Sequence, residues 1–473
     1  MNMKIREITK RQFDAYCYVR APLLRYMATE IAWFEAFDKK LMATVTRDHS
    51  DEDYGFVILG RDKQKVFRAI DFCRKFYTTP EEAISYLKIA LIPYENDGKE
   101  IYEQGDEKAL PNEILIPQVP AEKLHAYFKI MIEQQGYEAA RNLIKEIVYS
   151  YVDVDGNYIK DFQTTGFDAR LWELYLHVYL HTAGFKIDNS YQAPDYFISY
   201  FGDQLAIEAV TVNRSSTFDE PAPKGALEVL KLNRDYMPIK FGSALYTKLQ
   251  KKYWVKDHIK GKPFILAIHD FHMPATMDSL GSMTWSRDAL ADYLYGYRMK
   301  ITINDDGDIV RHIHDNGHGV EPVMEKIESH TWKSKTIPSN FFGLPDAENI
   351  SAVLFTNNAT LTTFNRMGKL AGLGNKDIKM LRIVSMYDPD PYATEPIRKV
   401  FDLDDPDYEE AWADGLIMYH NPDAKFPVEP ALFSDISHMF FDKKDKVLHG
   451  RMQPYDVFSS MTQVLIPKAN IHA

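Results

Sequence analysis

The stretch from Phe167 to Asn213 constrains this chain most, because it places acidic residues inside segments that are otherwise apolar. Its first part, residues 168–183, repeats apolar side chains at helical spacing and predicts a buried helix that Asp168 caps and Gly184 ends. Glu173 lies on the apolar stripe of this predicted helix. A charge in such a setting requires a partner, because burying an unpaired charge is costly.

Two more carboxylates follow on a predicted β-hairpin. Asp195 comes directly after Pro194, at the head of the extended segment 196–200, and Glu208 lies inside the segment 205–212. Strand alternation places Glu208 on a face whose other members are apolar. A tight turn between the two segments, at the Gly-Asp pair that separates them, brings Asp195 and Glu208 close to each other.

Adjacent carboxylates repel each other unless a cation lies between them or one takes up a proton. Magnesium prefers carboxylate oxygens and commonly uses one or two of them, together with water and substrate phosphate. The pattern therefore predicts a Mg²⁺ site, in which Mn²⁺ can substitute, held by Asp195 and Glu208 and completed by Glu173. Taken singly, each residue also has an ordinary interpretation as a salt-bridged, turn or outward-facing residue, so only the combination favours a metal.

In these residues the chain resembles the PD-(D/E)xK phosphodiesterases, which include restriction endonucleases, Holliday-junction resolvases and phage-defence nucleases. The resemblance rests on Glu173, on Pro194 with Asp195 and on Glu208, and it covers about residues 160–275. The predicted order of elements, helix, three strands, helix and strand, is the αβββαβ order of that superfamily's core. The resemblance implies an α/β fold with a restriction-endonuclease-like mixed sheet core, flanked by an N-terminal mixed α/β region and a C-terminal α+β region.

The superfamily pattern asks for a lysine two residues after the second acidic residue, where this chain has Val210. In the superfamily this lysine can be displaced onto a neighbouring helix, and the predicted helix 243–254 offers candidates. Lys248 and Lys252 are four residues apart and share one face of that helix, and Gln250 is a further candidate. The alternative is that both lysines are ordinary solvated residues.

Charge is distributed unevenly along the chain. The net charge of −12 argues against nucleic-acid binding by the whole surface. Between Lys224 and Lys262, however, ten basic residues stand against three acidic ones, directly after the carboxylates, where a phosphate backbone would need neutralisation. The predicted nucleic-acid-binding residues are Lys224, Lys231, Arg234, Lys240, Lys251 and Lys256.

The balance reverses between Asp388 and Asp414, where ten acidic residues stand against two basic ones. This acidic C-terminal region is a candidate surface for a partner protein or for a homo-oligomer.

With 473 residues, 45% of them hydrophobic, the chain can hold two or three domains with substantial cores. The predicted segments are an N-terminal α/β region with an antiparallel meander (1–118), helices plus the nuclease-like core (119–275), and a C-terminal α+β region (276–473). Within the core segment, residues 214–241 are predicted to form an inserted loop that faces DNA. Two cysteines, the lack of an apolar signal region and the lack of a long apolar run predict a cytoplasmic protein without a membrane partner.

Other polar clusters give rival sites. Glu173, His177 and His181 share a helix face and could hold a transition metal, although core histidines are the commoner outcome. A second set could bind a metal on a polar hairpin, or simply form its end. This set is His312, His314, His318 and Asp315. A third set could contact a nucleotide or serve as turn and cap residues. It consists of Asn357, Asn358, Asn365 and Arg366.

The leading hypothesis is a magnesium-dependent endonuclease acting on DNA; a role in bacterial defence against foreign DNA rests on the resemblance alone. Asp195 and Glu208 would hold the metal, Glu173 would complete the shell or orient a water, and a lysine, Lys248 or Lys252, would stabilise the attacking hydroxide or the pentavalent phosphate. A second hypothesis is a nuclease-like fold that has lost catalysis and binds nucleic acid or acts as a scaffold. A third, weaker one is a metal hydrolase that uses the histidines on the face of Glu173.

Overall fold

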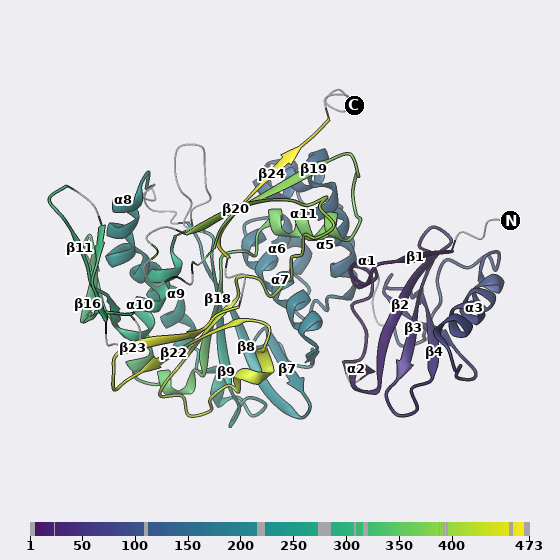
Figure 1. Cartoon of the computed structure of the whole chain (residues 1–473), viewed down its shortest axis with the longest axis horizontal. Coiled ribbons are helices and arrows are strands. Elements are labelled where there is room, and N and C mark those ends of the chain that lie inside the picture. Colours follow the sequence, from purple (N-terminus) through teal and green to yellow (C-terminus); the bar gives the residue numbers. More distant parts are fainter. Residues whose placement is uncertain are drawn as a thin grey trace. The chain divides into compact units, whose positions relative to one another are not determined.

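The computed structural model describes residues 5–22, 24–107, 112–214, 223–272, 285–306, 309–315, 320–386, 388, 390, 393, 396–453 and 457–467. The chain forms two compact units. Unit 1 is Met1–Lys186, Leu361–Met380 and Val464–Ala473, and unit 2 is Ile187–Thr360 and Leu381–Gln463. The units therefore interleave along the chain, whereas the sequence predicted three consecutive segments. Both contain helices and strands (Figure 1), in agreement with the predicted α/β class.

The N-terminal part of unit 1 is a five-stranded antiparallel meander, as predicted from its alternating apolar segments. The strands are β1 (Ile5–Ile8), β2 (Ala28–Ala36), β3 (Leu41–Asp48), β4 (Tyr54–Arg61) and β5 (Phe67–Phe72). Helix α3 (Pro80–Leu91) contributes Leu87 to the same core as Phe34 and Ile58. At its start, the Thr79 side chain accepts a hydrogen bond from the Glu82 amide and Pro80 occupies the first turn.

The rest of unit 1 is helical. Its helices are α1 (Lys10–Asp14), α2 (Leu24–Met27), α4 (Ala126–Glu133), α5 (Glu138–Ser150), α6 (Tyr158–Gln163), α7 (Phe167–Ala183) and α11 (Leu361–Leu370). Gly184 ends α7 with a φ of 91°, as predicted. The predicted cap at Asp168 is wrong, because α7 starts at Phe167 and its N-cap is Gly166, which puts Asp168 inside the first turn.

Helices α5 and α11 of unit 1 approach each other closely at Gly368. A Cβ atom on Gly368 would lie 2.4 Å from the carbonyl oxygen of Ala139. Nearby, the buried Asn365 donates to the Gly136 carbonyl at 2.7 Å and accepts from the Ala140 amide at 3.0 Å. Of the two roles considered for Asn365, the structure assigns the capping one, since its amide is used up at the start of α5.

Unit 2 is built on an eight-stranded mixed sheet with the strand order β23-β22-β21-β18-β9-β8-β7-β6. The strands are β6 (Lys186–Ile187), β7 (Tyr196–Tyr200), β8 (Asp203–Val212), β9 (Phe264–Asp270), β18 (Ala352–Thr356), β21 (Ile417–His420), β22 (Ser437–Asp442) and β23 (Val447–Arg451). β7 pairs antiparallel with β8, and β8, β9 and β18 are parallel to one another. The predicted hairpin and the strand that follows it are therefore present.

The helices of unit 2 differ from the prediction before the expected helix 243–254. Helices α8 (Ala226–Lys231) and α9 (Met237–Leu249) are joined by a π-helical turn, so the chain is helical from residue 226 to residue 249. The predicted loop over 214–241 is wrong from residue 226 onward, because the chain is helical there and buries Leu232, Tyr236 and Phe241 in the core. Residues 215–222 of that loop lie outside the described part. Helix α10 (Arg287–Tyr295) follows β9, as the apolar spacing predicted.

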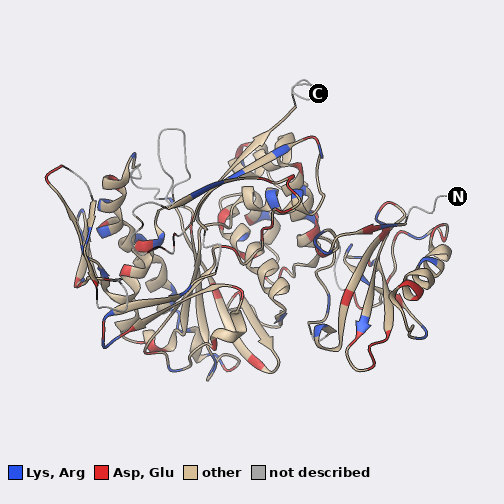
Figure 2. Cartoon of the chain, viewed as in Figure 1, with Lys and Arg blue, Asp and Glu red and all other residues tan. Residues whose placement is uncertain are grey.

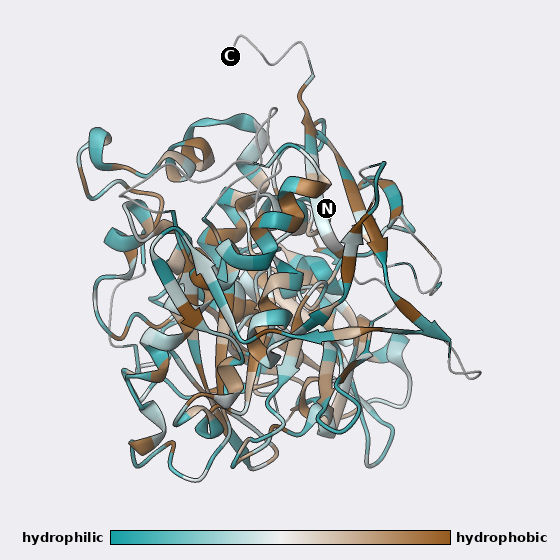
Figure 3. Cartoon of the chain, turned by 90° about the vertical axis from the view of Figure 1, so that its left-hand side faces the viewer, coloured by the Kyte–Doolittle hydropathy of each residue, from teal (hydrophilic) through white to brown (hydrophobic). Residues whose placement is uncertain are grey.

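Short antiparallel ladders lie between α10 and β18. They are β10 (Tyr297–Met299) with β15 (Met324–Lys326), β11 (Ile301–Ile303) with β12 (Ile309–Arg311), β13 (Ile313–Asp315) with β14 (Val320–Pro322), and β16 (Ser329–Trp332) with β17 (Lys335–Pro338). Figure 3 colours the chain by hydropathy and shows strands that carry both hydrophobic and hydrophilic residues.

A separate three-stranded sheet has the order β20-β19-β24. Its strands are β19 (Lys379–Met386), β20 (Ile397–Asp402) and β24 (Val457–Leu465). The buried Arg382 of β19 lies 3.3 Å from Glu410, a member of the acidic C-terminal region. At least one of the ten acids of that region is therefore an internal ion-pair partner and is not available to a partner protein.

We expect Gly368→Ala to destabilise the protein by several kcal/mol, because the new methyl group would collide with the Ala139 carbonyl. Without this contact, alanine in a helix interior would stabilise by roughly 1 kcal/mol. Urea unfolding of the variant and of Gly225→Ala, where a Cβ atom meets nothing within 4 Å, measures the difference. A Gly368→Ala protein as stable as the parent would contradict the described helix contact.

Candidate active site

Asp195 and Glu208 lie at the same end of the β7–β8 hairpin. The register pairs Tyr196 with Ile207; Asp195 directly precedes this pair along the chain and Glu208 directly follows it. The Oδ2 atom of Asp195 accepts a hydrogen bond of 2.7 Å from the Ala209 amide, the residue after Glu208. Asp195 is exposed, whereas Glu208 is 3% exposed.

Lys248 supplies a positive charge to this pair. Its Nζ lies 2.5 Å from Oε1 of Glu208, with 23% of the lysine side chain and 4% of the glutamate side chain exposed. The neighbouring Leu245 and Leu249 of α9 pack in the same core as Val210. The helix therefore covers the face on which Glu208 lies and delivers Lys248 there.

Lys252 does not share this position. Helix α9 ends at Leu249, and Lys252 has a φ of 48°, outside helical geometry. Its ammonium lies 2.7 Å from Asp346. The prediction that Lys248 and Lys252 share one helix face is therefore wrong. Gln250 is the exposed C-cap residue of α9.

Tyr253 is a member of this site that the sequence reasoning missed. Burial raises its pKa to about 12, and the neighbouring carboxylates Glu208, also through a hydrogen bond, and Asp195 act in the same direction. The phenol therefore stays protonated at neutral pH and can donate a hydrogen bond. The Lys-Lys-Tyr-Trp run from Lys251, at the end of the predicted helix 243–254, was the sequence signal that pointed to it.

His258 holds the segment that leads into Asp195. Its Nε2 lies 3.1 Å from the carbonyl oxygen of Ala193, and its ring stacks on Tyr191 with centroids 3.9 Å apart and planes at 5°. The edge of Phe197 meets the same ring. The loop before β7 is thus attached to the segment after α9, which fixes where Asp195 enters the sheet.

Glu173 belongs to unit 1 and has partners there. Arg170 donates to both of its carboxylate oxygens, at 3.1 and 2.8 Å, and the Tyr151 hydroxyl donates at 3.2 Å. The residue is 7% exposed, so the prediction of a buried carboxylate that needs a partner is confirmed. Its charge is balanced by an arginine one helical turn earlier.

The histidines on the face of Glu173 are neutral core residues. Burial lowers the pKa of His177 well below its ordinary value, and the neighbouring His181 adds to the effect. Burial lowers the pKa of His181 to about 4. Nε2 of His177 lies 3.2 Å from the Ser150 hydroxyl.

No three His, Cys, Asp or Glu side chains converge into a metal-binding group anywhere in the described part of the chain. This holds for the helix face of Glu173 and for the hairpin histidines alike. There, His312 lies 2.9 Å from the Thr302 hydroxyl and His314 is exposed, while His318 lies outside the described residues.

The predicted nucleic-acid-binding residues have different surroundings. Lys240 donates to the Asn213 carbonyl and Arg234 to the Ile301 carbonyl, so both bond to the backbone. Lys224 and Lys231 are exposed near α8. Lys251 and Lys256 are exposed as well, and their Nζ atoms lie 5.6 and 5.9 Å from the ring centroid of Tyr253. In Figure 2, basic and acidic segments are interspersed on most elements.

A buried acid–histidine pair at the end of β9 was also missed. Asp270 accepts from Nδ1 of His272 at 2.6 Å, and both side chains are fully buried. Burial opposes ionisation of Asp270, but His272 outweighs it and the pKa of Asp270 is lowered. Because neither residue reaches solvent, the pair stabilises the strand end and cannot receive a substrate where it lies.

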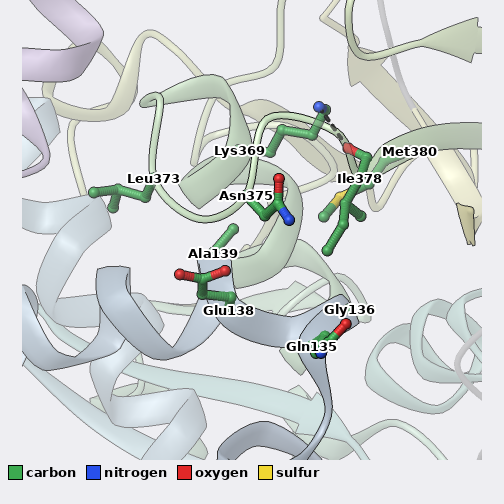
Figure 4. Close-up of a pocket in the computed structure, with 9 residues that line it drawn as sticks. All are labelled: Gln135, Gly136, Glu138, Ala139, Lys369, Leu373, Asn375, Ile378 and Met380. Atoms are coloured by element: carbon green, nitrogen blue, oxygen red, sulfur yellow. Dashed lines mark hydrogen bonds between the residues drawn. The ribbon is translucent and has the colours of Figure 1, made fainter. Parts of the chain in front are cut away.

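A small hollow in unit 1 lies between the start of α5 and the end of α11 (Figure 4). Glu138, Lys369 and Asn375 are among its lining residues, and the Lys369 ammonium is already bonded to the Ile378 carbonyl at 2.7 Å. Its volume of about 10 Å³ is room for roughly one water molecule. It is too small for a substrate.

No protein-family model, no curated protein and no solved structure matches this chain. In the described part of the chain, no helix has the length and apolar character needed to cross a bilayer. The candidate site therefore has to be judged on its own geometry.

We expect Lys248→Met to lower the free energy of unfolding by about 2 to 3 kcal/mol, because it leaves the buried Glu208 carboxylate without its cation. The double variant Glu208→Gln/Lys248→Met should recover much of that loss, since no unpaired charge remains. Urea denaturation of both variants at pH 7 tests this. Additive losses in the double variant would show that the two residues do not interact.

The neutral His181 makes unit 1 sensitive to acid. Its pKa of about 4 in the folded protein lies below the ordinary value of 6.5, so its contribution to stability is present above pH 6.5 and is lost as the pH falls towards 4. Between pH 6.5 and pH 4, we expect the free energy of unfolding to decrease in the parent. In His181→Gln we expect this decrease to be smaller by about 2 kcal/mol. Denaturation at several pH values, with the exposed His449→Gln as control, provides the measurement.

Proposed function

We propose that the chain is a divalent-metal-dependent nuclease that hydrolyses DNA phosphodiester bonds. The observation that carries the proposal is the contact of Lys248 with Glu208 on a mixed sheet, at the end of the hairpin where Asp195 also lies. In this reading the elements α7, β6, β7, β8, α9 and β9 follow the order of a restriction-endonuclease-like core. Lys248 then takes the place of the lysine that the PD-(D/E)xK pattern expects at Val210.

The donor set fits a magnesium or manganese ion. Mg²⁺ is commonly held by one or two carboxylates, with water and substrate phosphate as the other ligands. Asp195 and Glu208 lie at the same end of the β7–β8 hairpin, and the exposed Asp195 gives access from solvent. A closed protein cage would require a third ligand, but a magnesium site that also binds phosphate does not.

Each residue of the proposed site would have a different role in the in-line displacement at phosphorus. When bound, the cation would lower the pKa of a coordinated water and offset charge on the scissile phosphate. Asp195 and Glu208 would hold that ion and orient the attacking water. Lys248 would stabilise the negative charge that develops on the phosphate oxygens as water adds and the bridging oxygen leaves. Tyr253, which remains protonated, would donate a hydrogen bond within the same site.

The substrate class follows from the charge around the site. The basic segment after β8 supplies lysines for phosphate contacts, while the net charge of −12 disfavours unspecific binding elsewhere. DNA as the substrate and a role in defence against foreign DNA are parts of the proposal that rest on the resemblance to phage-defence nucleases.

A catalytically inactive scaffold is the second candidate. One observation favours it: Glu208 already has a cation, Lys248, at 2.5 Å. If this ion pair persists in the presence of metal, the Lys248 ammonium would neutralise the Glu208 carboxylate, and the site would bind no metal ion. Calorimetric titration with Mn²⁺ separates the two, because only the nuclease reading predicts binding that Asp195→Asn abolishes.

The direct test is cleavage of plasmid and linear DNA in Mg²⁺. We expect Asp195→Asn, Glu208→Gln and Lys248→Met each to lower the rate at least about 100-fold. The first two remove ligands of the proposed cation, and the third removes the ammonium group that would stabilise charge on the reacting phosphate. Lys425→Met, which removes a surface ion pair with Glu348, is a matched control and should cleave at the parent rate. Unchanged cleavage by the Asp195 and Glu208 variants would refute the proposal.

A further inference from the structure

Four lysines lie in or just after the last turn of α9, and they fall into two pairs. Lys248 contacts Glu208 and Lys252 contacts Asp346, so two of the charges are balanced by carboxylates. Lys251 and Lys256 have no carboxylate within ion-pair distance among the residues that the structure describes. Of these four lysines, only Lys251 and Lys256 therefore add to the local excess of positive charge.

Both unbalanced lysines lie beside the same ring. The Nζ atom of Lys251 is 5.6 Å and that of Lys256 is 5.9 Å from the centroid of Tyr253. Two ammonium groups beside one aromatic ring, neither paired with a carboxylate, give this part of the surface a positive potential that attracts an anion. Because both side chains are exposed, such an anion can arrive from solvent.

The position of the ring links this pair to the candidate active site. Tyr253 interacts with both Glu208 and Asp195. A nucleic-acid strand presents phosphates at regular intervals, so one phosphate can lie at the carboxylates while a neighbouring one meets the lysines. Aromatic rings next to such cations also offer a face on which a base can stack.

We propose that Lys251, Lys256 and Tyr253 form a second phosphate subsite, which binds a nucleotide of the nucleic-acid strand next to the one that is cut. The position next to a cleaved nucleotide rests on the proposed nuclease function. Binding of the strand itself does not require catalysis. The two lysines act as binding residues, and Tyr253 lies between them and the carboxylates.

The experiment measures binding of a fluorescent single-stranded 20-mer to the full chain by anisotropy, in Ca²⁺ and without metal, at several salt concentrations. We expect Lys251→Ala/Lys256→Ala to weaken binding at least about 10-fold and to lower the salt slope by about 1.4, because each phosphate contact on a single strand contributes roughly 0.7 to that slope. The matched control is Lys376→Ala/Lys399→Ala, which removes two exposed lysines elsewhere and should bind like the parent.

If the subsite binds a nucleic-acid strand, an oligonucleotide has to bind more tightly than a single nucleotide or a phosphate ion. We expect the 20-mer to bind far more tightly than the corresponding mononucleotide or inorganic phosphate; equal affinity per phosphate would overturn the assignment to a strand. Equal affinity and salt slope for the Lys251/Lys256 variant and the parent would overturn the subsite itself. Loss of cleavage but not of binding in Asp195→Asn is a separate outcome, so failure of the subsite and failure of the nuclease proposal can be told apart.

Discussion

The ion pair between Lys248 and Glu208 is the interaction on which the candidate site depends. Glu208 lies within a buried strand whose neighbours on the same face, Ala206 and Val210, are apolar. A carboxylate there would be strongly destabilising without a partner. The sheet can tolerate it only because α9 packs on that face and brings an ammonium group to 2.5 Å. The packing of one helix on one strand therefore decides whether the site exists at all.

The same rule operates elsewhere in the molecule. Glu173 in unit 1 is paired with Arg170, and Glu410 in unit 2 with Arg382. Glu173 lies in a segment with many apolar neighbours, as Glu208 does, whereas Glu410 lies in the acidic C-terminal region. Two of the three have an arginine that also takes part in a network with tyrosine hydroxyls or acids. A buried acid in this chain is thus usually balanced locally, and the exposed partner Asp195 is what makes the Glu208 site different.

The sequence predicted the parts of this arrangement that depend on short-range patterns. The meander, the α7 helix with its stop at Gly184, and the hairpin with Asp195 and Glu208 at the same end follow from alternation, helical spacing and turn residues. The helical run before α9 was missed because Pro223, Gly225 and Pro238 resemble loop residues, while the buried Tyr236 and Phe241 that hold it in place act through the tertiary core. The failure at Lys252 has a similar cause, since a left-handed residue three positions after the helix end cannot be read from spacing.

Where a helix ends also determines which lysines are free. Had α9 continued through Tyr253, Lys248 and Lys252 would have shared one face of the helix. Tyr253 would then have projected to a different face. Ending the helix at Leu249 instead turns Lys252 towards Asp346 and leaves Lys251 and Lys256 beside the Tyr253 ring. One change of backbone direction therefore separates a cation that stabilises the buried acid from two cations that remain available to an anion. The proposed phosphate subsite depends on this separation of charge rather than on the number of basic residues.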